Sequence, residues 1–224
     1  MPNYPIVSKR FSLAALLGFR RKTTVIPNGI QRMGERDVIS DIPDRILFVG
    51  RLVEQKRVSL LIRSLSALRA RAGITSLDIV GDGPDRAALE ALAADQGVAD
   101  HVTFHGSRFD WPSAFSPSTH LIALPSASEG MSNTVFEAMD HGFFPLVSDS
   151  AELRSLLAGF QEQPAFFPLD SSEAFVEAVE TIRNNGLEPL QRRIEALRDG
   201  LDAYSIPAMA ERYDTLYDQL LAGR

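Results

Sequence analysis

The sequence predicts an α/β fold in which helices cover both faces of a Rossmann-like parallel sheet. Three observations predict it. Short apolar runs recur from residue 46 onward, and helical patterns about 10–15 residues long separate them. The composition, with 45% hydrophobic and 23% charged residues, is that of a chain that buries a core. At 224 residues, the chain has the length of one to two domains.

The individual strands and helices follow from the order of these patterns. The run Ile46-Leu47-Phe48-Val49 predicts a first strand ended by Gly50, and apolar residues at helical spacing predict a helix over 58–71. A second strand over 77–80 is followed by a helix over 84–96 with proline in its first turn. Further strands are expected over 101–104, 121–124 and 144–147, and further helices over 133–141, 152–157, 173–183, 188–201 and 207–221.

The chain is expected to divide into three segments. Residues 1–45 differ in pattern from the rest and are interpreted as the remainder of another domain plus a linker. Residues 46–205 form the sheet domain, and residues 206–224 form a terminal helix that packs back toward the N-terminal side. This helix is expected to cover an apolar surface, because it carries one apolar stripe made of Met209, Tyr213, Leu216, Tyr217 and Leu220.

Charge and composition exclude several classes of function. The net charge of −6 gives no general reason to expect a nucleic-acid partner. The absence of cysteine excludes disulfides, thiol catalysis and thiolate zinc sites, and it fits a reducing compartment. The four histidines (His101, His105, His120 and His141) show no metal-ligand spacing, and none is assigned to catalysis.

The N-terminal region is basic. Residues 1–40 carry a net charge of +5, which leaves −11 on the rest of the chain. The apolar run over 11–19 resembles the core of a signal peptide, but Arg20-Arg21-Lys22 follows it instead of a cleavage site. No apolar stretch approaches the ~20 residues that span a bilayer. Two alternatives remain for residues 9–22: a short helix packed on a neighbouring domain, or peripheral contact with a membrane surface.

Candidate chemistry begins where the first strand ends. Ligands of open parallel sheets bind beyond the carboxyl ends of the strands. There, Lys56 and Arg57 stand at the start of a helix, where positive charge is unfavourable by ~0.3–1 kcal/mol. An anion held by Arg51, Lys56 and the helix terminus would reverse this penalty. The alternative is a solvated basic turn that Glu54 partly compensates.

The second strand ends in Gly81-Asp82-Gly83-Pro84. These glycines permit close approach of the backbone to a ligand, and they equally suit a tight turn from strand to helix. The segment is not the G-x-G-x-x-G dinucleotide fingerprint.

The segment from Glu129 to Glu137 is the most informative one. Ser132 or Asn133 is positioned to cap the next helix, whose free N–H groups then face the cleft. Glu137 lies one turn into that helix among apolar neighbours, and a carboxylate there needs a partner such as the vicinal hydroxyls of a sugar. Alternatively, Glu137 shares an exposed polar face with Asn133, Asp140 and His141.

Taken together, these motifs resemble the C-terminal half of retaining glycosyltransferases of the GT-B fold. The family they are similar to is the large family 4, with its E-x7-E motif. The resemblance covers about residues 24–222. It is carried in order by Ile26-Pro27-Asn28-Gly29, Gly50-Arg51 with Lys56, Val80-Gly81-Asp82-Gly83-Pro84, Val102-Thr103-Phe104-His105-Gly106, Pro125-Ser126, Glu129-Gly130 and Glu137-Ala138-Met139.

The resemblance implies a site for a nucleotide-sugar donor. By it, Arg51 and Lys56 hold the diphosphate and stabilise its departure, Glu129 contacts the donor sugar as a catalytic residue with them, and Glu137 bonds the ribose. The loop of Ser107 and Arg108 lies where the base docks. The resemblance also places Gly50, Gly81, Gly83, Gly130, Met131, Ser132, Asn133 and Thr134 at the donor. The sequence has no D-x-D pair, so no metal and no other cofactor is expected.

Two departures from the family pattern and one missing part qualify the resemblance. Arg57 stands where many members have glycine, and residues 149–152 lack the Gly-Gly loop of many members. The chain has room only for the donor-side domain, so we expect an acceptor-domain partner chain and a glycan or lipid-linked acceptor, in glycan or polysaccharide biosynthesis. The alternatives are a nucleotide-sugar-binding module without transferase activity and a GT-B nucleotide-sugar epimerase. The expected location is the cytoplasm or the inner face of the membrane.

Overall fold

The computed structural model describes residues 24–32, 38–129 and 131–222. Residues 9–22 and Gly130, which the sequence singled out, lie outside the described residues.

Six parallel strands form the sheet, in the order β3-β2-β1-β4-β5-β6. The strands are β1 (Arg45–Val49), β2 (Ser76–Val80), β3 (Val102–Gly106), β4 (His120–Leu124), β5 (Pro145–Ser148) and β6 (Ala165–Phe167). The chain moves outward from β1 to β3 and then returns to the other side of β1, so β1 and β4 flank the point where the strand order reverses. In open α/β sheets this is where ligands bind.

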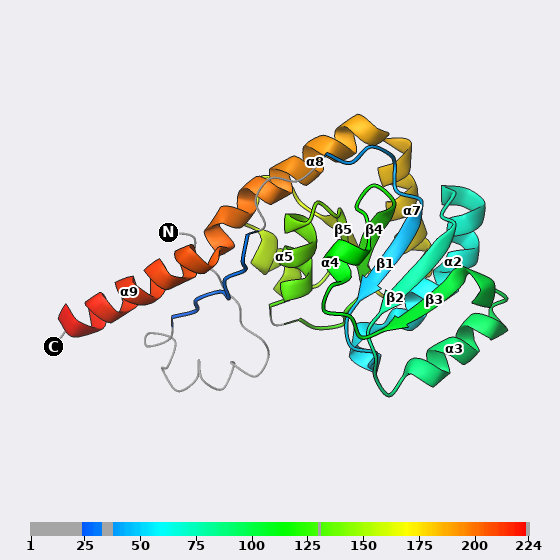
Figure 1. Cartoon of the computed structure of the whole chain (residues 1–224), viewed down its shortest axis with the longest axis horizontal. Helices are drawn as coiled ribbons and strands as arrows, with labels where there is room; N and C mark the ends of the chain where they lie inside the picture. The colour runs from blue at the N-terminus through cyan, green and yellow to red at the C-terminus, as the bar shows by residue number, and fades with distance from the viewer. Residues whose placement is uncertain (1–23, 33–37, 130, 223–224) are drawn as a thin grey trace.

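Helices cover both faces of the sheet, and the predicted Rossmann-like architecture is confirmed (Figure 1). The helices are α2 (Val58–Ala72), α3 (Arg86–Asp95), α4 (Trp111–Ala114), α5 (Asn133–Asp140), α6 (Ala151–Leu157), α7 (Ser172–Asn184), α8 (Leu187–Asp199) and α9 (Ile206–Ala222). Short 3-10 turns are η3 (Glu54–Lys56), η4 (Ala99–His101) and η5 (Gly200–Tyr204).

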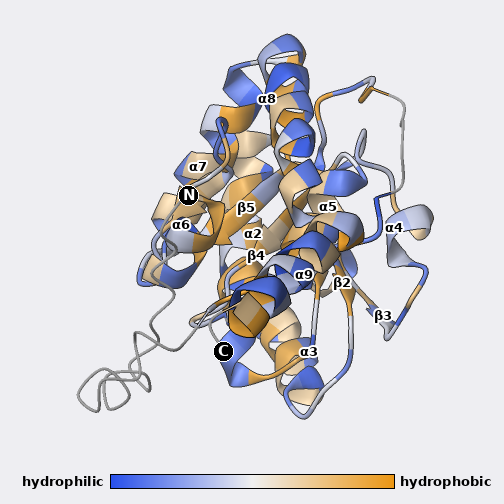
Figure 2. Ribbon diagram, turned by 90° about the vertical axis from the view of Figure 1, so that its left-hand side faces the viewer, coloured by the Kyte–Doolittle hydropathy of each residue, from blue (hydrophilic) through white to orange (hydrophobic). Residues whose placement is uncertain are grey.

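The core lies between these layers, and the central strands β4 and β5 are mainly hydrophobic (Figure 2). All five residues of β4 and the last four of β1 are buried, as expected for a sheet covered on both faces. A stack of three aromatic rings extends the core toward η5. The Tyr204 ring lies 4.7 Å from that of Phe136 and 5.3 Å from that of Phe160.

Several predicted boundaries were wrong, each for a local reason. The helix expected from Pro84 begins at Arg86, because Pro84 and Asp85 form a turn. The helix expected over 188–201 ends at Asp199 and continues as the 3-10 turn η5. The short elements α4 and β6 were not predicted, since four and three residues carry too little periodicity to detect.

The N-terminal described segment runs beside the start of α9. The Ile30 N–H donates to Tyr204 O at 2.8 Å, and the Ile206 N–H donates to Ile30 O at 3.0 Å. Arg32 Nε lies 2.9 Å from Oδ1 of Asp140, a residue that is 1% exposed. These contacts fix residues 24–32 against the helical end of the domain.

Helix α9 projects from the body of the domain (Figure 1). None of its residues is buried, and Tyr217 and Leu220 of its apolar stripe are 57% and 60% exposed. Within the described part of the chain, most of the stripe is therefore uncovered. Met209 contacts the N-terminal segment, where its Sδ accepts the Gly29 N–H at 3.1 Å. No helix in the described ranges has the length and apolar character that crossing a bilayer demands.

Candidate functional site

Two loops meet at the point where the strand order reverses. One leaves β1 and contains η3, and the other leaves β4 and leads into α5 (Figure 1). The Ala127 N–H donates to Gln55 O at 2.8 Å, and Gln55 Nε2 donates to Ser128 O at 2.6 Å. These reciprocal bonds hold the two loops side by side.

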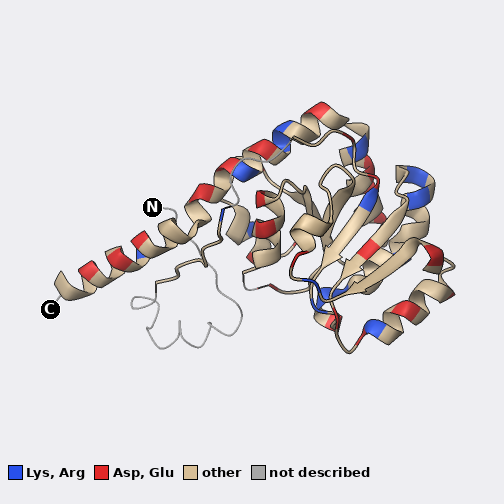
Figure 3. Ribbon diagram, in the orientation of Figure 1, with Lys and Arg blue, Asp and Glu red and all other residues tan. Residues whose placement is uncertain are grey.

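A charged pair completes this junction. Lys56 Nζ lies 2.5 Å from Glu129 Oε1, and the side chains are 21% and 11% exposed. Arg51 lies on the same loop as Lys56 and is exposed. Figure 3 shows basic residues on the loop that leaves β1. The structure thus brings Lys56 and Glu129 together and leaves the guanidinium of Arg51 accessible.

The glycines after β2 serve the packing of neighbouring loops. A Cβ at Gly81 would lie 1.8 Å from Gly50 O, and a Cβ at Gly83 would lie 2.2 Å from Leu52 O. The Leu52 N–H also donates to Asp82 O at 2.9 Å. The sequence left open approach to a ligand or a tight turn; the structure shows a third role for both glycines, the close approach of one strand-end loop to its neighbour.

Arg57 has an unusual backbone conformation. It precedes α2 with φ 51° and ψ 32°, and it is the single non-glycine residue of positive φ in the described ranges. Glycine adopts this left-handed region without the steric penalty that a Cβ brings. At position 57, where many family members have glycine, glycine would therefore be less strained than arginine.

Helix α5 begins at the same edge of the sheet. Ser132 is its buried N-cap residue, but the Ser132 side chain makes no capping hydrogen bond with any described residue. Asn133 and Thr134 form the first turn, whose N–H groups therefore receive no cap from Ser132. A helix N-terminus of this kind favours negative charge nearby.

Glu137 lies one turn further along α5, half-buried, and lines a cavity of about 320 Å³ with Asn133 and Trp111. Burial raises the pKa of the Glu137 carboxyl, and a hydrogen bond from the Trp111 side chain opposes this shift. The alternative of an exposed polar face is wrong, because Asp140 and His141 are 1% and 8% exposed. Among the described residues, Lys56 and Glu129 do not line this cavity.

The loop between β3 and α4 reaches the same cavity through Phe109. Ser107 and Arg108 of this loop are exposed and do not line the cavity; the Arg108 guanidinium donates to both carboxylate oxygens of Asp110, at 3.1 and 2.9 Å. Sequence reasoning missed Phe109 and Trp111, which line the cavity. Two aromatic residues in an otherwise polar stretch after a strand were the signal that could have found them.

Met131 connects the loop that follows β4 to the N-terminal described segment. Its Sδ accepts the Asn28 N–H at 3.0 Å. The predicted Ile26-Pro27-Asn28-Gly29 motif thus contacts the loop that follows β4, across a separation of 103 residues.

Comparison with known proteins gives the family. The family model described as glycosyl transferases group 1 matches residues 43–185. The chain belongs to the group 1 glycosyl transferases. This match covers all six strands of the sheet and both loops of the junction.

Curated group 1 relatives are longer than this chain. The chain is 37% identical over 105 residues to the GDP-mannose-dependent alpha-(1-6)-phosphatidylinositol monomannoside mannosyltransferase of Mycolicibacterium smegmatis, covering 46% of this chain and 27% of that protein. It is 29% identical over 187 residues to the lipopolysaccharide core biosynthesis glycosyltransferase LpsE of Rhizobium meliloti, covering 80% and 52%. The chain therefore spans about a quarter to a half of the length of these relatives.

Solved structures agree on the fold of this group 1 glycosyltransferase domain. The TarM structure from S. aureus, a complex that includes UDP, matches with a TM-score of 0.78 and 16% identity over 94% of this chain and 43% of that one. WaaG, a glycosyltransferase involved in lipopolysaccharide biosynthesis, matches with a TM-score of 0.68 and 23% identity, over 85% and 56%. The fold is that of one half of a GT-B enzyme.

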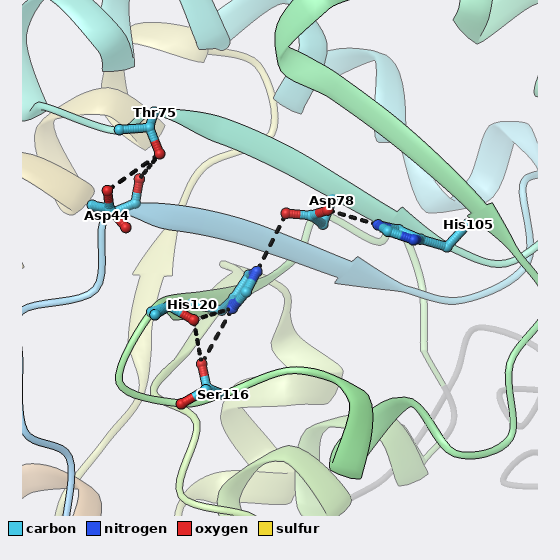
Figure 4. Close-up of polar contacts among 7 residues, drawn as sticks. Asp44, Thr75, Asp78, His105, Ser116 and His120 are labelled. Atoms are coloured by element: carbon cyan, nitrogen blue, oxygen red, sulfur yellow. Dashed lines mark hydrogen bonds and ion pairs between the residues drawn. The ribbon is translucent and has the colours of Figure 1, made fainter.

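A buried polar cluster lies away from the junction in this group 1 domain (Figure 4). Asp78 accepts from His105 Nε2 at 2.6 Å and from His120 Nε2 at 3.2 Å. Burial of the Asp78 carboxyl opposes ionisation, but the bonds and charges of His120 and His105 outweigh it and hold the pKa of Asp78 below its ordinary value. The cluster joins β2, β3 and β4 beneath the segment that carries Trp111.

Proposed function

We propose that this chain is the donor-binding half of a retaining glycosyltransferase of family 4 type. It would transfer a sugar from a nucleoside diphosphate-sugar to a glycan or lipid-linked acceptor in glycan biosynthesis. The observation that carries the proposal is the Lys56–Glu129 pair, which places a cation and a carboxylate at the carboxyl ends of the two central strands.

The proposed roles follow from the chemistry of the departing diphosphate. Breaking the glycosidic bond builds negative charge on the leaving group, which fixed cations and a helix N-terminus stabilise. Arg51, Lys56 and the start of α5 would supply this stabilisation without a metal ion. Glu129 would contact the sugar, and its bond to Lys56 would link the sugar position to the diphosphate position.

Other residues would hold the nucleoside. Glu137 would accept hydrogen bonds from the ribose hydroxyls, because a half-buried carboxylate offers two acceptor oxygens to a vicinal diol. Backbone N–H groups of Met131, Ser132, Asn133 and Thr134, with Gly130, would approach the sugar and phosphate. The loop of Ser107 and Arg108 would lie beside the base.

Two of the similar proteins support this donor class. One relative is named as GDP-mannose-dependent, and one structural neighbour is a complex that includes UDP. Both are proteins with a second half that this chain does not match. We propose that residues 46–205 bind the donor and that the uncovered stripe of α9 meets an acceptor-side domain on a partner chain.

A thermal-shift screen of the chain against UDP-, GDP- and ADP-sugars tests the proposal. A ligand that binds only the folded state raises the melting temperature. We expect one class of nucleotide-sugar to do so, and the shift to vanish in Lys56→Ala. The absence of any shift with all three classes at millimolar concentration would contradict donor binding.

A second candidate function is a nucleotide-sugar-binding module without transfer activity. The single sheet of the described residues carries the proposed donor contacts at its strand ends, which is what such a module needs. The two functions separate when the chain is mixed with the product of a neighbouring gene that encodes an acceptor-side domain. Sugar transfer by the mixture, lost in Glu129→Gln, supports the enzyme; donor binding without transfer supports the module.

A further inference from the structure

Phe109 is the most exposed of the large apolar side chains in the described ranges. Its relative exposure is 103%, whereas the next, Leu221 on α9, reaches 67%. Its two neighbours in sequence, Arg108 and Asp110, form the bidentate pair with donor–acceptor distances of 3.1 and 2.9 Å. The pair closes the loop on itself, so Phe109 stands at its tip and is held there by flanking residues that bond to each other.

The loop tip borders the cavity of Glu137. Phe109, Trp111 and Glu137 line this space of about 320 Å³ together with Asn133 and His141. Trp111 is 5% exposed and packs against Phe143 with ring centroids 5.7 Å apart, so the base of the loop is anchored in the core. The cavity therefore combines a half-buried carboxylate with a fully exposed aromatic side chain.

We propose that Phe109 is the stacking platform for the nucleobase of the donor. The inference rests on the proposed function and adds a residue that neither the sequence motifs nor the comparisons assign. An aromatic side chain binds a base through its π face, whatever the base, with ~1–3 kcal/mol per stacked base. A nucleoside is the ligand that needs both groups here, an acceptor for its ribose hydroxyls and a flat apolar surface for its base.

Trp111 links these two groups. It lines the cavity beside Glu137, and it is separated from Phe109 by one residue only. The buried ring that borders the ribose acceptor therefore also anchors the loop that carries the base platform. This coupling makes the loop between β3 and α4 a determinant of nucleotide affinity.

Calorimetry on the whole chain tests the proposal with GDP, UDP, ADP and inorganic pyrophosphate as probes. We compare the wild-type protein with Phe109→Ala, Phe109→Leu and Phe109→Trp. Alanine and leucine should each weaken the best nucleoside diphosphate about 5- to 150-fold, since leucine keeps apolar volume but has no π face. Tryptophan should retain affinity, and pyrophosphate should bind all four proteins equally.

The outcomes separate this inference from the proposed function. Failure of the wild-type chain to bind either pyrophosphate or any nucleotide would overturn both. Nucleotide affinity that is unchanged in Phe109→Ala, or kept in Phe109→Leu, would overturn the stacking role alone, as would a parallel loss of pyrophosphate binding. If Phe109→Ala instead weakens only association with an acceptor-side chain, the exposed ring is a protein contact and the inference is wrong.

Discussion

Lys56 Nζ lies 2.5 Å from Glu129 Oε1, although 73 residues separate them in the chain. The two side chains belong to loops that leave neighbouring strands and that are already joined by the bonds of Gln55. Because both groups are largely buried, removal of either one leaves the other charge with poor access to water. The pair thus helps to hold the two loops together and, in the proposed function, forms part of the donor site.

We expect Lys56→Ala to weaken binding of nucleoside diphosphates by about 1.5–3 kcal/mol, because a charge-assisted contact to the diphosphate is lost. Arg63→Ala is the matched control, since it removes the same charge from an exposed position on α2. Calorimetry measures both affinities. Equal affinities of wild-type and Lys56→Ala proteins would remove Lys56 from the site.

We expect Glu137→Gln to lower affinity for ribonucleotides, because the amide offers the ribose hydroxyls one neutral acceptor oxygen in place of two charged carboxylate oxygens. Binding of inorganic pyrophosphate, which has no ribose, should stay unchanged. Equal losses for both ligands would contradict the ribose role.

The pH dependence of the same site gives an independent prediction. Burial raises the pKa of Glu137, so on acidification the folded protein protonates this carboxyl earlier than an ordinary glutamate. Nucleotide affinity should therefore decline as pH falls through this raised pKa. The Glu137→Gln protein, measured over the same pH range, reports the part of the pH dependence that comes from protonation of the nucleotide. An identical pH profile in both proteins would argue against Glu137 as a ligand of the nucleotide.

The Asp78 cluster predicts acid-sensitive stability. The folded-state pKa of Asp78 is lowered, so its ionised form stabilises the fold above the unfolded-state pKa, and this contribution is lost as pH falls through the folded-state value. Asp78→Asn should reduce the free energy of unfolding by about 1.5–3 kcal/mol at neutral pH. Denaturant unfolding at a series of pH values should show this difference shrinking in acid; a constant difference would contradict it.

The left-handed conformation of Arg57 predicts a stabilising substitution. Arginine and alanine meet the same steric penalty at φ 51°, whereas glycine does not. Arg57→Gly should therefore be more stable than Arg57→Ala by about 1 kcal/mol, measured by thermal or denaturant unfolding. If the two variants were equally stable, strain at this position would be absent.

The close approach of Gly81 to Gly50 predicts a large destabilisation. Gly81→Ala places a Cβ 1.8 Å from a backbone oxygen and should lower the free energy of unfolding by about 3 kcal/mol or more. Gly97→Ala is the matched control, because Gly97 also has positive φ (66°) but its Cβ would meet nothing within 4 Å. We expect about 1 kcal/mol there, and similar losses at both positions would refute the packing argument.

Much of the fold was predictable from local patterns. The runs 46–49 and 121–124 are continuously apolar, because helices on both faces bury the sheet on both sides. The helix that begins at Asn133 was predicted for a related reason, since its apolar residues face the core. Elements without such periodicity, β6 and α4, escaped prediction.

The candidate site was predictable only in part. The motifs placed Lys56, Glu129 and Glu137 near strand ends, but they did not show which of these residues contact each other. Phe109 was not predicted as a site residue, because a single exposed aromatic residue does not change the hydrophobic periodicity of the sequence. The glycines at 81 and 83 were interpreted as suited to a ligand or to a tight turn, and their packing against the neighbouring loop was not predicted.

The sequence by itself determined the α/β class, the order of strands and helices along the chain, and the residue types at the strand ends, because each depends on neighbours within about one helix or strand length. Tertiary structure alone decided that Lys56 meets Glu129, that Trp111 meets Glu137 and that Asp78 lies between two histidines. Such pairings join residues far apart in sequence, and they depend on strand order and burial, which set both distance and the strength of electrostatic interaction.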